Sequence, residues 1–353
     1  MTPNENISPV EQQRRDRLKA EKPRVYEKVV RFAEKIKRGE SIAMIAVQYR
    51  YRCNMRCVHC SIKPLQNVKE KRSLTLADIR DISRQADEMG LANIAITGGE
   101  PLLFPDLDEL LDAFGPKTFH YSMDTNGWFL DEAKAAHLKK IGVDKVQISL
   151  DSLSAEEHDS FRRTPGAHER AIRAIDAAAK AGLMTNIATV VTKQRIRSGE
   201  FIEFLEFARS KGVSTYVTYA KPIGAWQGNV DVLVDRNDMD YLRELEKKYD
   251  VFTHLTPSYG LDLGCSAVKR MLAVTQYGDV LPCPYIQTSL GSIFEEPLQK
   301  IIERGMRIKW FHDRIDTCLI AEDREFIGKY AVKLYDKPLP VPHDEVFEKD
   351  DYR

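Results

Sequence analysis

The chain has 353 residues, which is long enough for one large α/β domain plus a smaller module. Its 53 Lys and Arg residues balance 53 Asp and Glu residues, so the charge gives no indication of nucleic acid or an acidic membrane surface as a partner. The N-terminus is polar and no apolar stretch is as long as a membrane-spanning helix, so the sequence predicts a cytoplasmic protein without a membrane contact. Six cysteines without an export signal indicate metal ligands rather than disulfides.

Residues 1–41 are rich in Arg, Lys and Glu, and they precede the first strand that the sequence predicts. Apolar side chains recur there at roughly helical spacing, at Val25, Tyr26, Val29, Val30, Phe32 and Ile36. This pattern predicts an amphipathic helical extension that lies on the main domain, and a partner-binding role stays open.

A cysteine loop follows directly after an apolar run at residues 42–47 that is typical of a buried strand. Cys53, Cys57 and Cys60 have the spacing Cys-x3-Cys-x2-Cys, and three thiolates on one loop can hold three irons of a cubane iron–sulfur cluster. Because no fourth cysteine lies nearby, one iron stays open for a ligand that is not protein. A zinc site is the alternative, since Cys-x2-Cys pairs commonly bind zinc, although a structural zinc ion needs four ligands.

The next predicted strand, residues 93–97, ends in Gly98-Gly99-Glu100-Pro101. Two glycines let the backbone approach a ligand closely, Glu100 supplies a carboxylate for an ammonium group, and the proline fixes the exit of the turn. This turn and the cysteine loop before it together resemble the signature of the radical S-adenosylmethionine (SAM) enzymes.

The resemblance implies a 4Fe-4S cluster whose open iron is chelated by the amino and carboxylate groups of SAM. An electron from the cluster then cleaves SAM and yields a 5′-deoxyadenosyl radical. The resemblance also implies that Gly98, Gly99 and Glu100 hold the amino group of SAM, and that the ring of His59 packs on its adenine.

From residue 42 onward, short apolar runs alternate with amphipathic segments. Strands are predicted near 42–47, 93–97, 118–123, 145–150, 185–191 and 215–219, and helices near 76–89, 105–114, 131–141, 168–181 and 200–211. This alternation predicts an α/β fold with a parallel sheet, and the count fits the partial (β/α)6 TIM-like barrel of the family, over residues 42–227.

Small polar side chains follow two of these strands, where a barrel places its ligand-binding groups. Asn126 follows the third strand, while Ser149 and Asp151 lie at the end of the fourth, and the resemblance assigns all three to SAM. Arg162 is a candidate for neutralising the SAM carboxylate, although a solvated helix surface explains an arginine there equally well. Further residues are candidates for substrate contact only: Thr189, Thr192, Tyr216, Thr218 and Lys221.

A second cysteine group follows a linker and helix at residues 228–250. Cys265 precedes a hairpin pattern at 272–281, and Cys283 and Cys318 follow it, so the hairpin should bring the first two cysteines together. Residues 251–330 resemble the auxiliary-cluster module called SPASM or, in its short form, twitch, which implies a second 4Fe-4S cluster. Its fourth ligand is either the substrate or one of four side chains, namely His312, Asp316, Glu322 and Asp323. Buried, inert cysteines are the alternative.

Residues 331–353 contain three prolines and a run of acids, and the composition predicts an extended tail. The sequence as a whole predicts a radical SAM enzyme that abstracts hydrogen from a small-molecule or peptide substrate in a biosynthetic or maturation pathway. Its auxiliary cluster would bind that substrate or accept an electron, and a flavodoxin or ferredoxin would supply electrons. The alternatives are a ribosomal-peptide maturase of the SPASM type and a non-catalytic zinc-binding scaffold.

Overall fold

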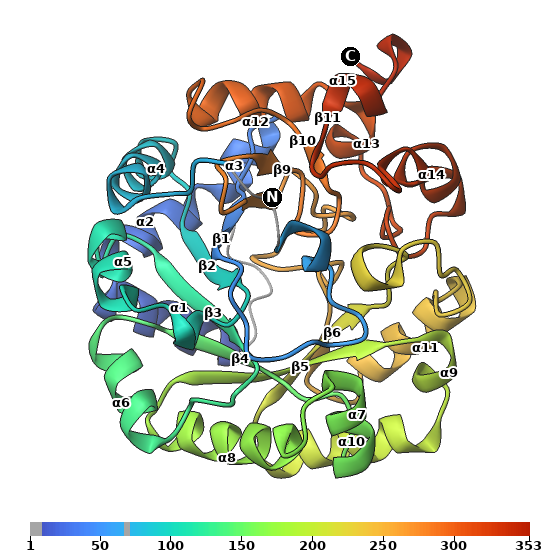
Figure 1. Ribbon diagram of the computed structural model, residues 1–353. Coiled ribbons are helices and arrows are strands. Elements are labelled where there is room, and N and C mark those ends of the chain that lie inside the picture. Colours follow the sequence, from blue (N-terminus) through green and yellow to red (C-terminus); the bar gives the residue numbers. More distant parts are fainter. Residues whose placement is uncertain (1–8, 67–70) are drawn as a thin grey trace.

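The computed structural model describes residues 9–66 and 71–353. Its main feature is a sheet of nine strands in the order β7-β6-β5-β4-β3-β2-β1-β8-β9, curled around a central space with helices on its outside (Figure 1). Neighbouring strands are parallel except for the pair β8 and β9. The strands are β1 (Met44–Arg50), β2 (Asn93–Gly98), β3 (His120–Thr125), β4 (Lys145–Ser149), β5 (Met184–Val191), β6 (Ser214–Tyr219), β7 (Val251–Phe252), β8 (Met271–Val274) and β9 (Val280–Leu281).

Helices and short 3-10 turns connect these strands along the chain. They are η1 (Lys63–Leu65), α4 (Leu76–Glu88), η2 (Pro101–Leu103), α5 (Leu107–Phe114), α6 (Glu132–Lys140), α7 (Ala155–Arg162), α8 (Ala167–Lys180), α9 (Lys193–Ile196), α10 (Gly199–Ser210), η3 (Gly224–Trp226) and α11 (Arg236–Glu246). The helix α4 begins at a capping box, in which Thr75 and Asp78 each satisfy the other's backbone N–H group.

The predicted α/β barrel of six strands is confirmed by β1 to β6, and the sheet extends beyond it at both edges. The strand β7 pairs with β6, and β8 pairs with β1, so parallel pairing runs through eight strands. The predicted hairpin around residue 278 is present as β8 and β9, and it joins the barrel sheet.

Along each strand, apolar side chains that face the helices alternate with small or polar side chains that face the barrel centre, which explains why this centre is open. Side chains that face the helices are apolar and buried, as are Ile45 and Val47 in β1. The alternate positions carry small or polar side chains that line a central cavity: Ala46, Gln48, Ala95, Thr97, Ser122, Asp124, Gln147, Asn186 and Ala188. Barrels usually fill this space with layers of bulky residues, so these small side chains leave room for a ligand.

The N-terminal extension consists of three helices in place of the one that the sequence predicts. These are α1 (Pro9–Glu21), α2 (Pro23–Val30) and α3 (Phe32–Lys37), and Pro23 begins the second of them, where the fixed φ of proline suits a first helical turn. Val25 and Phe32 are buried against Ala92, just before β2, so α2 and α3 lie at the amino ends of the strands (Figure 1).

Three buried lysines of this extension bind backbone carbonyl oxygens at the amino ends of the barrel strands. Lys22 donates to the carbonyl oxygens of Phe119 and Gly142, Lys28 donates to that of Thr118, and Lys35 donates to that of Met89. Met89 and Gly142 lie just after the ends of α4 and α6, while Thr118 and Phe119 lie just before β3, so these lysines tie the extension to the loops that precede the strands.

The C-terminal region packs against the barrel in the upper part of Figure 1. Its elements are β10 (Thr288–Ser289), α12 (Leu298–Met306), α13 (Lys309–His312), α14 (Arg324–Lys329), η4 (Ala331–Leu334), β11 (Val341–Pro342), α15 (His343–Val346) and η5 (Lys349–Asp351).

The prediction of an extended tail after residue 331 is wrong. The strand β11 pairs with β10, and Val346 and Phe347 are buried. The proline-rich composition indicated a solvated segment, but the apolar residues between the prolines and acids have a surface to pack on.

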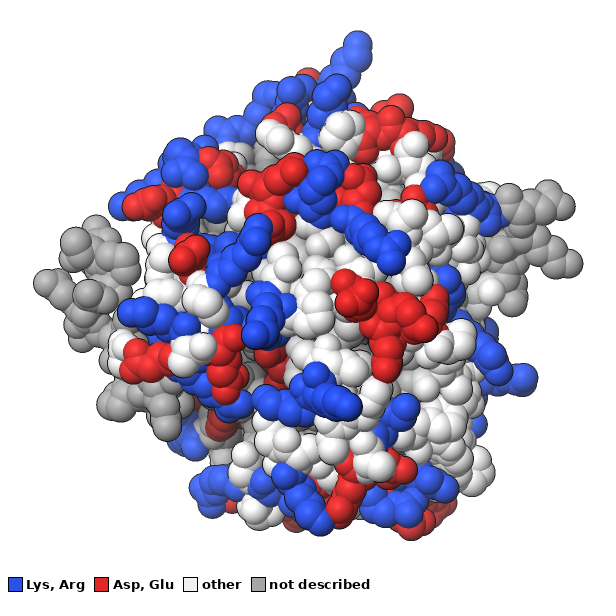
Figure 2. Space-filling model, turned by 90° about the vertical axis from the view of Figure 1, so that its left-hand side faces the viewer, with Lys and Arg blue, Asp and Glu red and all other residues white. Residues whose placement is uncertain are grey.

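Positive and negative side chains are mixed over the face in Figure 2, without a large patch of either sign. Within the described residues, no helix combines the length and the apolar character that crossing a bilayer requires.

Candidate functional site

The first cysteine group lies in the loop after β1, at the carboxyl end of the strand. Cys53, Cys57 and Cys60 are partly buried, and all three line the central cavity. Burial raises the pKa of the Cys53 thiol to about 11. In the described residues, no group of three or more His, Cys, Asp or Glu side chains is arranged to hold a single metal ion.

Two glycines at the end of β2, Gly98 and Gly99, hold the start of this loop. A Cβ atom on Gly98 would clash with the carbonyl oxygen of Arg50, and one on Gly99 would clash with that of Arg52. The N–H groups of Gly99 and Glu100 donate to these two oxygens at 2.8 and 2.9 Å. The missing side chains therefore let the backbone approach the cysteine loop closely, a role that the sequence analysis did not anticipate, and both glycines also line the cavity.

We expect Gly99→Ala to destabilise the protein, because the new methyl group meets backbone that cannot rotate away. Overpacking of this kind costs about 1–3 kcal/mol, and the cysteine loop should shift with it. Gly199→Ala is the matched control, since its Cβ meets nothing within 4 Å and its φ is not positive. Denaturant unfolding of both variants checks this, and equal stabilities would contradict it.

The other end of the loop is held by two further segments. The N–H of Val58 donates to the carbonyl oxygen of Phe161 at 3.0 Å, and that of Ala225 donates to the carbonyl oxygen of Cys60 at 3.0 Å. A Cβ on Gly224 would clash with that same Cys60 oxygen. The segment after β6 is thus a support that the sequence analysis missed, because a single Gly gives only a weak turn signal.

Glu100 is buried and organises the loop after β3. Its carboxylate accepts hydrogen bonds from the Thr125 hydroxyl (2.6 Å) and from the N–H groups of Asn126 (2.8 Å) and Leu102 (3.1 Å). Burial raises the pKa of Glu100 to about 7, against these three donors. Asn126 in turn donates to the side chain of Asn54 at 2.9 Å and lies 4.0 Å from the sulfur of Cys53.

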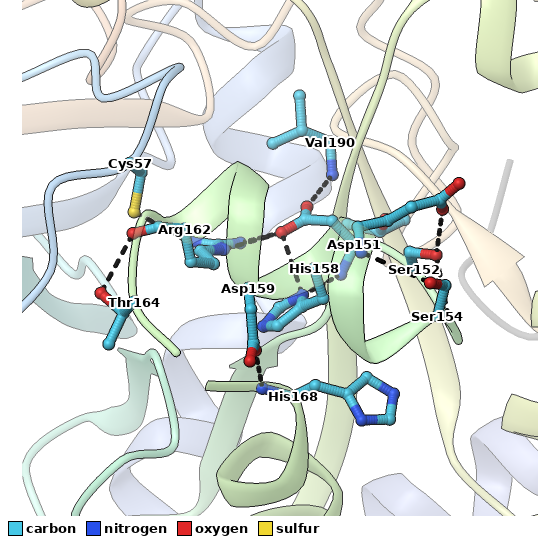
Figure 3. A network of polar contacts seen from close by, with 12 residues as sticks. Cys57, Asp151, Ser152, Ser154, His158, Asp159, Arg162, Thr164, His168 and Val190 are labelled. Atoms are coloured by element: carbon cyan, nitrogen blue, oxygen red, sulfur yellow. Dashed lines mark hydrogen bonds and ion pairs between the residues drawn. The ribbon is translucent and has the colours of Figure 1, made fainter. Parts of the chain in front are cut away.

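A buried ion pair supports the middle of the cysteine loop (Figure 3). Arg162 binds the Asp151 carboxylate through Nε at 2.7 Å and through Nη2 at 2.6 Å, and its Nη1 donates to the sulfur of Cys57 at 3.8 Å. The second oxygen of Asp151 accepts from the N–H of Val190 at 3.0 Å. Burial by itself raises the pKa of Asp151, but the Arg162 guanidinium outweighs burial and holds it at about 2.

Asp151 therefore differs from the SAM contact that the sequence predicts. Its carboxylate is taken up by Arg162 and Val190, and it is not among the residues that line the cavity, whereas Ser149, Asn126 and Arg162 are. The side chain of Thr192, one of the candidates for substrate contact, is also occupied, because it accepts from the N–H of Arg195 as the N-cap of α9.

His59 faces the cavity with one side of its ring covered. It stacks on Phe161 at 4.4 Å between centroids and lies 5.8 Å from Trp226. Its Nδ1 is buried without a hydrogen-bond partner, and burial lowers the pKa of the ring to about 3. A neutral ring with an unsatisfied nitrogen at a cavity wall fits contact with a polar heterocycle such as adenine.

The second cysteine group surrounds a separate, smaller pocket. Cys265, Cys283 and Cys318 are buried and all line it, together with Ser266, Ala267, Ile286, Leu319 and Ile320. Cys265 is held by its N–H group, which donates to the carbonyl oxygen of Ile315 at 2.7 Å. Burial raises the pKa of the Cys283 thiol to about 11. Three thiols around one enclosed pocket fit a cluster with one thiolate on each of three irons.

A thin wall separates this pocket from the central cavity. Five side chains line both spaces: Tyr216, Lys221, His254, Met271 and Tyr285. In the wall, the buried ammonium of Lys221 donates to the carbonyl oxygen of Tyr219 at 2.7 Å and lies 3.9 Å from the centre of the Tyr285 ring. The two cysteine groups thus lie at different places around one cavity, with Lys221 between the cavity and the second group.

Three of the four side chains that the sequence analysis offered as a fourth ligand are engaged elsewhere, and the fourth, Glu322, keeps one buried oxygen, Oε1, without a hydrogen-bond partner in the described chain. His312 contacts Asp313 and Arg353, and Asp316 pairs with Arg314. Asp323 caps α14, and one oxygen of Glu322 accepts from the N–H of Cys318 at 3.3 Å. None of the four lines the pocket of the second cysteine group.

Comparison with known proteins agrees with both motifs. The family model of the radical SAM superfamily matches residues 47–208, and that of SPASM, an iron–sulfur cluster-binding domain, matches residues 265–321. The chain is 31% identical to a GTP 3′,8-cyclase of Nautilia profundicola over 74% of this chain and 88% of the relative. It is 27% identical to an AdoMet-dependent heme synthase of Methanosarcina barkeri, over 83% of this chain and 92% of the relative. It is 28% identical to the mycofactocin maturase MftC of Mycobacterium tuberculosis, over 73% of this chain and 68% of the relative.

Solved structures share the fold at lower identity. Streptococcus suis SuiB bound to its precursor peptide SuiA superposes with a TM-score of 0.60 at 20% identity, covering 78% of this chain and 68% of SuiB. The protein anSMEcpe with bound AdoMet superposes with a TM-score of 0.59 at 17% identity, covering 84% of this chain and 98% of anSMEcpe. The two family models favour iron–sulfur clusters over the zinc alternative. The chain belongs to the radical SAM superfamily and is an enzyme with SAM, a 4Fe-4S cluster and an auxiliary 4Fe-4S cluster as its cofactors.

Proposed function

We propose that this enzyme reductively cleaves SAM and abstracts a hydrogen atom from a small molecule or short peptide in a biosynthetic or maturation pathway. The observation that carries the proposal is a single cavity of about 2130 Å³ that reaches from Cys53, Cys57 and Cys60 to the wall of the second cysteine pocket. Pockets for drug-sized ligands are roughly 300–1,000 Å³. This cavity is larger and also reaches the N-terminal helices at Leu18 and Ile36, so it has room for SAM and a substrate together.

In this proposal the first cysteine group holds the radical-generating cluster. When bound there with SAM, the cluster supplies an electron that cleaves the sulfonium to give a 5′-deoxyadenosyl radical. The backbone at Gly98 and Gly99, with Glu100, holds the amino group in the methionine part of SAM. His59, Asn126 and Ser149 contact the nucleoside part. Asp151 has a positioning role, since it fixes Arg162 against Cys57.

The substrate would lie in the part of the cavity next to the wall. Thr189, Tyr216, Thr218 and Lys221 line the cavity there, and they offer hydroxyl groups and one buried ammonium. Within the described contacts Lys221 has no carboxylate partner. Burial lowers the pKa of Lys221, and the thiolates of Cys318 and Cys283 oppose this from the second cysteine pocket. On the cavity side the ammonium has no carboxylate partner among the residues described, which favours a substrate with an anionic group at this place.

Metal analysis after anaerobic reconstitution tests the cofactor content of the two cysteine groups. Two 4Fe-4S clusters give about eight irons per chain, and a purely structural second group gives about four. A protein that binds only zinc, and leaves SAM intact, would contradict the proposal.

Replacing Cys265, Cys283 and Cys318 by Ala together separates the roles of the two groups. We expect this variant to retain cleavage of SAM to 5′-deoxyadenosine, because the first cysteine group and its supports lie on other segments, and to lose product formation. Liquid chromatography of deoxyadenosine and product from the same reaction measures both. Full turnover by the variant would show that the auxiliary cluster has no role in the reaction.

Two further points belong to the proposal. A flavodoxin or ferredoxin would deliver the electron to the first cluster. Among substrates, a ribosomally made peptide is the second candidate, supported by the names of two relatives, the maturase MftC and SuiB with its precursor peptide. The cyclase and the heme synthase support a small molecule instead.

A further inference from the structure

The auxiliary cluster of the proposed function lacks a fourth cysteine ligand. Three thiolates occupy three irons, so the remaining iron is bound by a side chain of the protein or by the substrate. His312 and the three acidic side chains that were offered from the sequence do not line the pocket of the second cysteine group. A protein ligand therefore has to come from the residues that line the pocket of Cys265, Cys283 and Cys318.

Few of these lining side chains offer a donor that suits iron. The ammonium of Lys221 has no free lone pair, and Ala267, Ile286, Leu319 and Ile320 are apolar. Tyr216, Tyr285 and Ser266 offer neutral hydroxyls and Met271 a thioether, which are weaker donors than an imidazole nitrogen. His254 also lines the pocket, and imidazole is an established substitute for thiolate on iron–sulfur clusters. It lies in the second position after β7, at the carboxyl end of a barrel strand, where ligand-binding groups of such folds gather.

The contacts of His254 fix its backbone and leave its ring nitrogens available. Its carbonyl oxygen accepts from Arg270 at 2.7 Å, and its ring lies edge-on to that of Tyr219 at 5.4 Å between centroids. In the described part of the chain, none of the hydrogen bonds engages a ring nitrogen of His254. The ring is instead set between the central cavity and the cysteine pocket.

We infer that a ring nitrogen of His254 is the fourth ligand of the auxiliary cluster, completing a Cys265, Cys283, Cys318 and His254 set. This inference rests on the proposed function, because it needs a cluster at the second cysteine group. One nitrogen–iron bond forms, and no electron is transferred. All four irons are then bound by protein, so the substrate does not bind this cluster through an open iron and stays on the cavity side of the wall.

Pulsed electron paramagnetic resonance of the auxiliary cluster alone tests the assignment. A full-length Cys53→Ala/Cys57→Ala/Cys60→Ala background removes the first cluster, and the protein is made with histidine carrying the heavy nitrogen isotope. After anaerobic reconstitution and reduction, we expect a nitrogen coupling that changes with the isotope. The coupling should vanish in His254→Ala and in His254→Cys, with the thiolate of the second variant retaining four irons.

His312→Ala is the matched control and should keep the coupling, because His312 contacts Asp313 and Arg353 outside the pocket. A reconstituted cluster without an isotope-dependent coupling in the His254-containing protein overturns the inference but leaves the auxiliary cluster standing. A coupling that persists in His254→Ala overturns it as well. Absence of iron from the background protein contradicts the auxiliary cluster of the proposed function itself. If His254→Ala fails to fold, His254→Cys takes its place, and a coupling that persists in His254→Cys overturns the inference.

Discussion

Replacing Cys57 by Ala is expected to abolish cleavage of SAM to 5′-deoxyadenosine and to lower the iron content from about eight to about four per chain. The reason is that the first cysteine group has three sulfurs for three irons, and the described residues place no spare thiol in its loop. Cys57 is the member whose sulfur receives the Arg162 contact, so its loss also removes the group that faces this buried cation.

Iron analysis and the deoxyadenosine assay on one anaerobic preparation measure both effects. Cys57→Ser is the second variant, because it keeps the size of the side chain and separates loss of a ligand from loss of packing. Circular dichroism establishes that both variants fold. A folded Cys57→Ala that cleaves SAM at the wild-type rate would contradict the placement of the radical-generating cluster.

The barrel could be predicted from the sequence because its signals are local. The buried strand β1 begins in a near-continuous apolar run at residues 42–47, and helices such as α4 carry an N-cap residue and a Gly just after their end. The edges of the sheet could not be predicted, because β7 has only two residues and β8 pairs with β1 across more than two hundred residues of chain. The fold of residues 331–353 depends in the same way on the distant partner strand β10.

The site could be predicted where one motif carries the chemistry, as in the cysteine loop and the Gly98-Gly99-Glu100 turn. The segments that hold the cysteine loop in place could not be predicted from the sequence. Gly224 and Phe161 contact this loop only because β6 and α7 end beside it in the folded chain. His254 gives no sequence signal at all, since it follows a strand too short to detect.

Breaking the buried ion pair of Asp151 and Arg162 is expected to lower both the stability of the protein and its rate of SAM cleavage. We expect Asp151→Asn to lower the free energy of unfolding by about 3–5 kcal/mol near neutral pH, because it leaves the Arg162 guanidinium buried without a counter-charge. It should also slow SAM cleavage, because Arg162 then loses its position beside Cys57 (Figure 3). Glu132→Gln is the matched control, since the exposed pair of Glu132 with Lys180 contributes under about 1 kcal/mol.

The pH dependence of this effect follows from the pKa of Asp151. Because the folded protein holds that pKa at about 2, below the value of about 3.9 in an unfolded chain, the carboxylate stabilises the fold fully above about pH 4. The stabilisation is lost as the pH falls toward 2, where Asp151 takes up a proton in the folded state too. The difference in stability between wild type and Asp151→Asn should therefore be constant near neutral pH and shrink below about pH 4. Denaturant unfolding at several pH values measures it, and a difference that grows on acidification would mean that Arg162 is balanced by some other group.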